Sequence, residues 1–273
     1  MAYDSVRHKV VLFGGNSSST TLNDTWEYDG TNWTQVATTG PGAREYFAMV
    51  YDPVGQRTLL YGGLNGSELG DMWAWNGTTW TQLMITTPPA RGWPGMVYDS
   101  TRQVVVMFGG SVASTAKNDT WEFNVSTNVW TQRTSAGSPL ARFVWSMIAY
   151  DPTRQRVVQF GGFDSSVSGG SNQTQEYNGS TWTTISTSGT PQALWASTMA
   201  FDPLNNTVFL VDGALSGGVV NSTTYSYASP AYTSGTSPTS RGWHMMTYDS
   251  FRNRMVVFGG YDGNSSTNDT WEY

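Results

Sequence analysis

The chain has 273 residues, of which only 12% are charged, and its net charge at pH 7 is −6. This charge argues against a nucleic-acid partner, because neutralising phosphates requires clustered Lys and Arg. Cysteine is absent, which excludes disulfides, thiolate metal sites and cysteine nucleophiles. No run of about 18 apolar residues is present, so no membrane-inserted segment is expected.

The first 36 residues contain a pattern that recurs along the whole chain. An alternating run ends at Asp4, and after a turn an apolar strand over residues 10–13 ends in a glycine pair at 14–15. A polar loop, a Trp/Tyr-rich segment over 23–28, an Asp-Gly turn and a last strand signal over 33–36 complete the unit. The aromatic-Asp landmark recurs every 47 to 52 residues, at Asp4, Asp52, Asp99, Asp151, Asp202 and Asp249. A fixed period near fifty residues predicts a repeat architecture.

The glycine pair recurs at 62–63, 109–110, 161–162 and 259–260, and is replaced by Asp212-Gly213 in the fifth unit. This pair after an apolar strand, with the Trp/Tyr-rich strand and the later Trp, resembles the kelch repeat, six times over the chain. The resemblance implies an all-β fold, a six-bladed β-propeller with four-stranded antiparallel blades. The blades are expected at about 1–40, 41–87, 88–137, 138–189, 190–238 and 239–273 of one domain over 1–273.

Turn signals divide each unit into four strands, which in the second unit are expected at 46–51, 58–61, 72–75 and 80–84. The links between the first and second strands and between the third and fourth are short. The other links are longer and vary between units. Because alternate links of an antiparallel meander lie at the same end, one face of the ring should be tight and the other long-looped. The long-looped face is the expected place for a binding site.

The two ends and the fifth unit depart from the pattern. The chain opens inside the first strand of unit one and closes after the third strand of unit six, so the last blade should lack its outer strand. The seam over 1–4 and 271–273 is then expected to be the least stable part, and a segment like 29–48 would complete the ring. The fifth unit has no Trp in its last strand; its divergence reflects either a ligand-facing specialisation or drift, with drift favoured.

Arginine and glutamate occur together in four of the six units and are both absent from the other two. The second unit has Gly55 and Ala74 at the two positions, and the fifth has Asn205 and Ser226. A carboxylate between packed blades needs a partner, since an unpaired buried charge costs several kcal/mol. We therefore expect structural ion pairs within the blades, at Arg7–Glu27, Arg102–Glu122, Arg154–Glu176 and Arg252–Glu272.

A second set of residues stands at the start of the first strand of units two to six. In kelch propellers this strand is innermost, so the resemblance implies a ring round the channel mouth on the long-looped face. Arginine supplies forked donors for carboxylates or phosphates, and aromatic faces stack on sugars. In the other interpretation, the arginines pair with loop carbonyls and the aromatics plug the ring. The candidate ligand-binding residues are Arg44, Tyr46, Arg91, Trp93, Arg142, Trp145, Trp195, Arg241, Trp243 and His244.

Two classes of function remain. The favoured one is a non-enzymatic binding module that holds a glycan or an acidic peptide at the channel mouth. The alternative is a carbohydrate-active enzyme resembling the kelch-type sialic acid epimerases, with His244 and the mouth arginines acting on a sugar carboxylate. Acid–base work needs two groups within reach of one substrate, and the sequence offers one suitably placed histidine. No catalytic residue, metal or cofactor is therefore assigned.

Localisation and assembly are inferred from composition. The Lys-poor, Thr/Asn/Trp-rich surface resembles that of bacterial secreted or cell-surface kelch proteins, although no signal peptide is present in this chain. A monomer is expected unless the open seam pairs with another chain.

Overall fold

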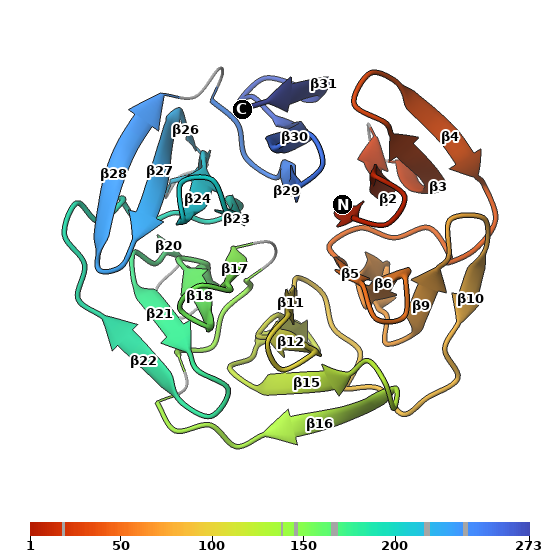
Figure 1. Ribbon diagram of the computed structural model, residues 1–273, viewed down its shortest axis with the longest axis horizontal. Helices are drawn as coiled ribbons and strands as arrows, with labels where there is room; N and C mark the ends of the chain where they lie inside the picture. The colour runs from red at the N-terminus through yellow and green to blue at the C-terminus, as the bar shows by residue number, and fades with distance from the viewer. Residues whose placement is uncertain (18–19, 138, 145–146, 165–168, 216–218, 237–239) are drawn as a thin grey trace.

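The computed structural model describes residues 1–17, 20–137, 139–144, 147–164, 169–215, 219–236 and 240–273. Six antiparallel sheets stand round a central channel as the blades of a propeller (Figure 1). Five blades have four strands and the sixth has three. Within the described ranges every regular element is a β-strand. These ranges contain no helix long and apolar enough to cross a membrane. The predicted all-β, six-bladed propeller with an incomplete last blade is confirmed.

The inner two strands of each blade carry most of the buried residues. The innermost strands contact one another round the channel; they are β1 (Ala2–Asp4), β5 (Ala48–Asp52), β11 (Gly95–Asp99), β17 (Ile148–Asp151), β23 (Thr198–Asp202) and β29 (Met245–Asp249). The second strands are β2 (Lys9–Ser17), β6 (Arg57–Tyr61), β12 (Val104–Phe108), β18 (Arg156–Phe160), β24 (Thr207–Val211) and β30 (Arg254–Tyr261).

The outer strands complete the blades. The third strands are β3 (Thr20–Tyr28), β9 (Met72–Trp75), β15 (Thr120–Asn124), β21 (Thr174–Tyr177), β27 (Thr223–Ala228) and β31 (Ser266–Glu272). The fourth are β4 (Trp33–Ala37), β10 (Trp80–Gln82), β16 (Val129–Arg133), β22 (Trp182–Ile185) and β28 (Ala231–Thr236). In the loops between second and third strands lie four short ribbons, β7–β8 (Leu64–Asn65, Ser67–Glu68), β13–β14 (Ser111–Val112, Thr115–Ala116), β19–β20 (Phe163–Asp164, Gly169–Gly170) and β25–β26 (Gly213–Ala214, Val220–Asn221).

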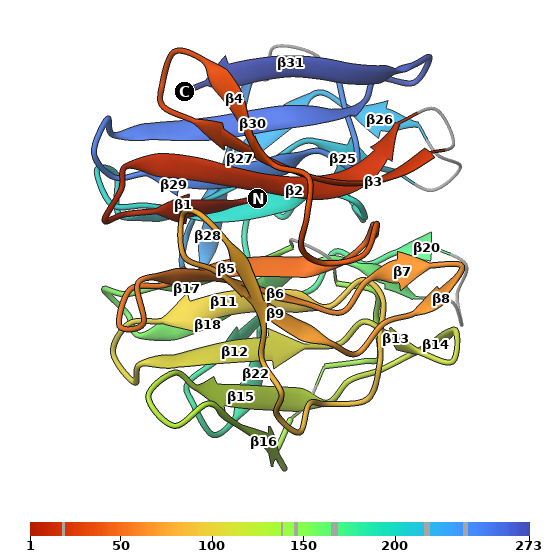
Figure 2. The same cartoon turned by 90° about the vertical axis from the view of Figure 1, so that its right-hand side faces the viewer.

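The landmark aspartates form the tight turns of one face. In blade 1, Oδ1 of Asp4 accepts hydrogen bonds from the backbone N–H groups of Val6 and Arg7, each at 3.0 Å. The same Asp-centred turn recurs in blades 2, 3 and 6. An Asp side chain that bonds its own backbone two and three residues on stabilises such a turn. The ribbons lie on the opposite face, at the right in Figure 2.

The glycine pairs let neighbouring blades approach closely. Gly62 has a φ of 74°, and a Cβ there would lie 2.6 Å from the carbonyl oxygen of Arg91 in the next blade. The N–H of Gly63 donates to that same oxygen at 2.9 Å. Only a residue without a side chain fits such an approach and such a backbone. Larger apolar residues, among them Leu59, Val105 and Phe123, then fill the wedge between blades 2 and 3.

Candidate binding site at the channel mouth

A series of aromatic side chains in successive contact lines the channel mouth beside the ribbons, from Tyr46 to Trp243. Tyr46 stacks on Trp93 with ring centroids 4.7 Å apart, and Trp93 contacts Phe143 at 5.3 Å. Phe143 and Phe163 lie 5.8 Å apart, Phe163 and Trp195 5.5 Å, and Trp195 and Trp243 5.1 Å. We call these six residues, Tyr46, Trp93, Phe143, Phe163, Trp195 and Trp243, the aromatic ring. Trp145 lies outside the described residues.

The aromatic ring is set on an unusual backbone. Tyr46, Trp93 and Trp243 have φ values of 57°, 53° and 59°, in the left-handed region. This conformation is rare for bulky residues and costs of the order of 1–3 kcal/mol each. Hydrogen bonds between blades hold it, since the N–H of Trp93 donates to the Tyr46 carbonyl at 2.7 Å and that of Trp243 to Ala196 at 2.9 Å. The mouth is therefore built from rigid positions linked blade to blade.

The left-handed residues also explain a shift in strand boundary. The sequence predicts the first strand of blade 2 over 46–51, whereas β5 runs from Ala48 to Asp52. Since Tyr46 is not extended, the strand cannot begin there, and the side chain turns to the channel mouth instead of joining the sheet.

A cavity of about 380 Å³ lies inside the aromatic ring, lined by its six side chains and Ala196. All six aromatic residues are half-buried, so each is fixed by neighbours yet keeps part of its surface exposed. Cavities of about 300–1,000 Å³ lined by aromatic side chains are typical of small-ligand sites. The structure therefore brings Tyr46, Trp93, Trp195 and Trp243 of the predicted set together, and adds Phe143 and Phe163.

The arginines of the predicted set do not face this cavity. Their exposed fractions are 2% for Arg44, 0% for Arg91, 1% for Arg142 and 2% for Arg241. Arg91 donates from Nη1 to the Gly109 carbonyl at 3.0 Å and to Asp119 Oδ1 at 2.8 Å, and from Nη2 to Asp119 Oδ2 at 2.9 Å. The prediction that these arginines bind ligand is corrected: each guanidinium joins the start of a blade to its third strand.

The partner of the arginine changes from blade to blade. Arg44 pairs with Asp71 and Arg241 with Asp269 in the same two-point manner. Arg142 instead donates to the side-chain oxygen of Gln173 at 2.5 Å. In blade 5, Leu194 takes the place of the arginine and Thr223 that of the carboxylate. Arginine and aspartate occur together in blades 2, 3 and 6 and are both absent from blade 5, which identifies the two positions as a structural pair.

The acidic partners are held in the ionised form. Burial alone would raise the pKa of Asp119, but hydrogen bonds from Arg91 and Trp121 outweigh burial and leave the pKa below its usual value. Burial would likewise raise the pKa of Asp71, but hydrogen bonds from Arg44 and Trp73 outweigh burial and lower it. For Asp269 the bond from Arg241 is the largest cause of a lowered pKa. The positive charges of Arg44, Arg91 and Arg241 are therefore compensated within their own blades.

His244 is also removed from the mouth. Its side chain is fully buried, and burial with the nearby charge of Arg241 lowers its pKa to about 3. The imidazole is neutral at physiological pH and has no path to a ligand. Its predicted role at the site is corrected for this reason.

The four predicted Arg–Glu pairs all form. Arg7 Nη1 lies 2.6 Å from Glu27 Oε1, and Arg154 Nη1 lies 2.5 Å from Glu176 Oε1. Arg102 contacts Glu122, and Arg252 contacts Glu272. In each blade the same arginine also pairs through Nε with the landmark Asp, at 2.7 Å.

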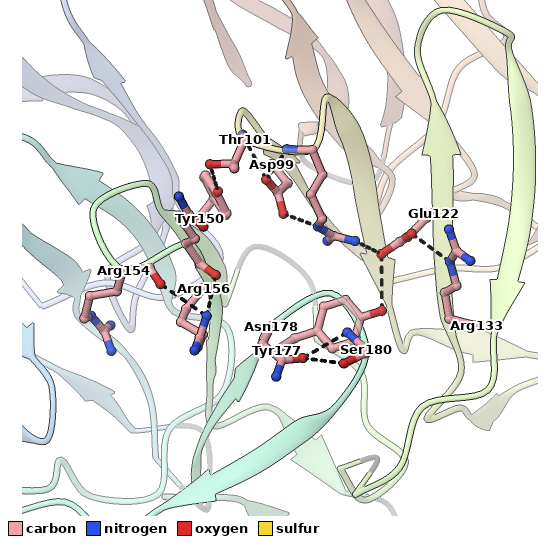
Figure 3. Close-up of polar contacts among 12 residues, drawn as sticks. Asp99, Thr101, Glu122, Arg133, Tyr150, Arg154, Arg156, Tyr177, Asn178 and Ser180 are labelled. Atoms are coloured by element: carbon pink, nitrogen blue, oxygen red, sulfur yellow. Dashed lines mark hydrogen bonds and ion pairs between the residues drawn. The ribbon is translucent and has the colours of Figure 1, made fainter.

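These pairs also reach the next blade. Tyr177 of blade 4 donates its hydroxyl hydrogen to Glu122 of blade 3 at 3.2 Å, and Arg133 approaches the other oxygen of Glu122 at 2.7 Å (Figure 3). Tyr227 donates to Glu176 at 2.8 Å and Tyr28 to Glu272 at 3.2 Å. The glutamates are therefore occupied by blade-to-blade contacts on the tight-turn side and do not belong to the mouth.

Sequence analysis did not predict two features of the site. Phe163 directly follows its glycine pair. The same position holds Tyr261 in blade 6 but Leu64, Ser111 and Ala214 in blades 2, 3 and 5, so most units gave no aromatic signal there. The Arg–Asp pairs join residues 27 or 28 positions apart. The sequence nevertheless contains a signal for these pairs. In each blade with an Asp-paired arginine, the Asp stands two residues before the Trp of the third strand.

In the part of the chain that the structure describes, no group of three His, Asp or Glu side chains is placed to hold a metal ion. A scan against protein-family models gave no match, and a search of the curated proteins gave no significant match. The residues at the channel mouth therefore carry the functional interpretation.

Proposed function

We propose that the chain is a kelch-type propeller that acts as an extracellular binding module and holds a neutral glycan in the aromatic ring. The observation that carries this proposal is the series of five successive ring contacts that lines a cavity of about 380 Å³. The recurring glycine pairs and Trp-rich third strands support the kelch assignment. The Lys-poor surface supports an extracellular setting.

The chemistry of the cavity fits a sugar ring. A pyranose has apolar C–H faces that stack on aromatic side chains, and its hydroxyl groups stay hydrated at an open mouth. The half-buried aromatics offer such faces without reordering, because their backbones are held between blades. Three of them keep a strained φ, and backbone strain of this kind clusters at functional sites.

A neutral ligand is favoured over an anionic one. An acidic peptide or a sugar carboxylate would need positive charge at the mouth, but Arg44, Arg91 and Arg241 are buried against aspartates. The net charge of −6 disfavours an approaching anion further. The acidic-peptide ligand therefore loses its support.

The groups considered for the enzyme alternative, His244 and the glutamates, are also withdrawn from the mouth. Acid–base catalysis requires a group with a suitable pKa within hydrogen-bond reach of the substrate. His244 is fully buried with a pKa of about 3, and the four paired glutamates lie in ion pairs. Binding without catalysis is the function that the geometry favours.

Calorimetric titration of the protein with neutral oligosaccharides and their sialylated or uronic counterparts tests the proposal. We expect binding of at least one neutral sugar, weakened about tenfold or more by Trp93→Ala, as for a central aromatic contact. Phe251→Ala, which removes an exposed aromatic side chain from the turn after β29 on the tight-turn face, should leave the affinity unchanged. Binding of anionic sugars alone, or equal loss in both variants, would contradict the proposal.

A further inference from the structure

The wall of the mouth cavity offers aromatic faces and few polar side-chain groups. Three of its residues are tryptophans, Trp93, Trp195 and Trp243. The indole N–H of Trp195 already donates to the carbonyl oxygen of Leu215 at 3.1 Å, so it is not offered to a ligand. The face of an aromatic side chain is the negative end of its quadrupole. A cation is therefore attracted to such a wall, and most strongly to tryptophan.

The buried arginines next to the mouth do little to repel a cation. Arg44, Arg91 and Arg241 each pair with an aspartate of their own blade. Arg142 has the neutral Gln173 as its side-chain partner, but it is 1% exposed and its guanidinium points into blade 4. The chain as a whole carries a net charge of −6. The overall field of the protein therefore attracts cations to its surface.

A carboxylate stands beside the aromatic ring. Glu45 directly precedes Tyr46 and is half-buried. Burial raises the pKa of the Tyr46 hydroxyl, and the negative charge of Glu45 raises it further, so this charge is felt at the ring. Among the described residues no lysine or arginine forms an ion pair with Glu45, and burial raises its own pKa. The charge of Glu45 is therefore available to attract a cation at the mouth.

The same wall discriminates among cations. A primary ammonium ion has three N–H donors, and these lose their hydration in a cavity whose wall offers few acceptors. A quaternary ammonium ion has no N–H group and presents its positive charge through methyl groups. Enclosure by aromatic side chains is a recurring means of recognising such ions. The cavity of about 380 Å³ lies in the lower part of the range for ligand sites, which suits a small head group.

We propose that the aromatic ring binds a quaternary ammonium group, with Trp93 and the other aromatic faces against its methyl groups and Glu45 attracting it from the edge of the mouth. This inference rests on the proposed function in one respect, since it uses the same cavity as a ligand site, and it adds a second class of ligand. The C–H groups of a sugar carry a weaker partial positive charge, so one aromatic wall can serve both classes.

The test is calorimetric titration at neutral pH and low salt with choline and two analogues. In the first analogue a tert-butyl group replaces the trimethylammonium group, which keeps the shape and removes the charge. The second is ethanolamine, which keeps the charge and lacks the methyl groups. We expect saturable binding of choline and at least about tenfold weaker binding of each analogue. Acetylated trimethyl-lysine amide is titrated beside choline, and the tighter of the two shows whether the group comes from a modified protein or a free small molecule.

Three variants locate the site. Trp93→Leu keeps an apolar wall but removes one aromatic face, so it should weaken choline binding about tenfold and narrow the gap between choline and the tert-butyl analogue. Glu45→Gln should weaken choline binding about threefold, as expected for the loss of one partly screened charge. Asp29→Asn removes an exposed carboxylate from the turn after β3 on the tight-turn face and should leave choline binding unchanged. Melting temperatures equal to that of the parent show that the variants are folded.

The proposal is overturned if choline and its tert-butyl analogue bind equally, or if neither choline nor the trimethyl-lysine probe binds. It is overturned as well if Trp93→Leu and Glu45→Gln leave choline binding intact, or if Asp29→Asn weakens it as much as Glu45→Gln does. A neutral sugar that binds where choline does not would refute this inference and leave the proposed function standing. Choline binding with the expected response to the variants, but no sugar binding, would support this inference and refute the neutral glycan.

Discussion

The guanidinium of Arg91 and the carboxylate of Asp119 form a two-point ion pair inside blade 3, with nitrogen–oxygen distances of 2.8 and 2.9 Å. Arg91 is fully buried, whereas the Asp119 side chain keeps 20% of its surface exposed. The pair joins the first residues of the blade to the residue that immediately precedes its third strand, β15. It therefore sets the position of Trp93, two residues on, in the aromatic ring.

Replacement of this pair should be strongly non-additive. Arg91→Leu leaves the Asp119 carboxylate unpaired and should cost about 3 kcal/mol of unfolding free energy, the lower end for a broken buried pair because Asp119 is partly solvated. The double variant R91L/D119T copies Leu194 and Thr223 of blade 5 and should recover more than half of that loss. Urea unfolding of the single and double variants measures the coupling. Additive losses would mean that the pair is not a unit.

The free energy of unfolding should decrease in acid, because protonation of Asp119 removes its ion pair with Arg91. Hydrogen bonds from Arg91 hold the folded-state pKa of Asp119 below the value of about 3.9 for an unfolded Asp. The contribution is therefore present above about pH 3.9 and is lost as the pH falls through the folded-state pKa. Asp119→Asn should be less stable than the parent at pH 6, with the gap shrinking at pH 3. Urea midpoints at several pH values check this, and a constant gap would contradict it.

His244 should give a separate loss at higher pH. Burial lowers its folded-state pKa to about 3, whereas an unfolded His titrates near 6.5. Because the unfolded chain then binds the proton more readily, stability should decline as the pH falls below about 6.5. His244→Phe, which copies Phe47 at the matching place in blade 2, should remove this part of the decline and leave sugar binding intact. An NMR titration of the His244 ring between pH 8 and 5 would contradict burial if it showed a proton gain.

The glycine pair at the junction of blades 6 and 1 should exchange its backbone hydrogens quickly. The N–H of Gly63 donates to the Arg91 carbonyl of the next blade at 2.9 Å, whereas its counterpart Gly260 lines a cleft between blades 6 and 1. We expect the Gly260 amide to exchange at least about tenfold faster than that of Gly63, because local stability follows such contacts. Native-state exchange followed by NMR compares the two. Equal protection would mean that the junction is closed in solution.

The fold was predictable because its determinants are local and repeated. The landmark aspartates make turns with their own backbone, and the glycine pairs permit a close approach that no other residue allows. The Arg–Glu pairs were visible because both members appear or disappear together. Six units in one chain supplied the comparison that a single blade would lack.

The site was only partly predictable, because the sequence does not distinguish an arginine that faces the channel mouth from one that points into its own blade. Arg44 and Tyr46 are two residues apart, yet the left-handed backbone at Tyr46 turns its ring to the cavity while Arg44 points into the blade toward Asp71. His244 follows Trp243 directly and is fully buried. Which side chain faces the channel depends on backbone geometry that the repeat pattern does not encode.

In the function that we propose, the aromatic ring, and not the other tryptophans, receives the ligand. The chain has 13 Trp residues, and their indole N–H groups give separate signals in a two-dimensional ¹H–¹⁵N NMR spectrum. On addition of a neutral oligosaccharide that binds, the indole signals of Trp93, Trp195 and Trp243 should shift, while those of Trp73, Trp121 and Trp182 should stay in place. Shifts confined to Trp73, Trp121 and Trp182 would contradict ligand binding in the aromatic ring.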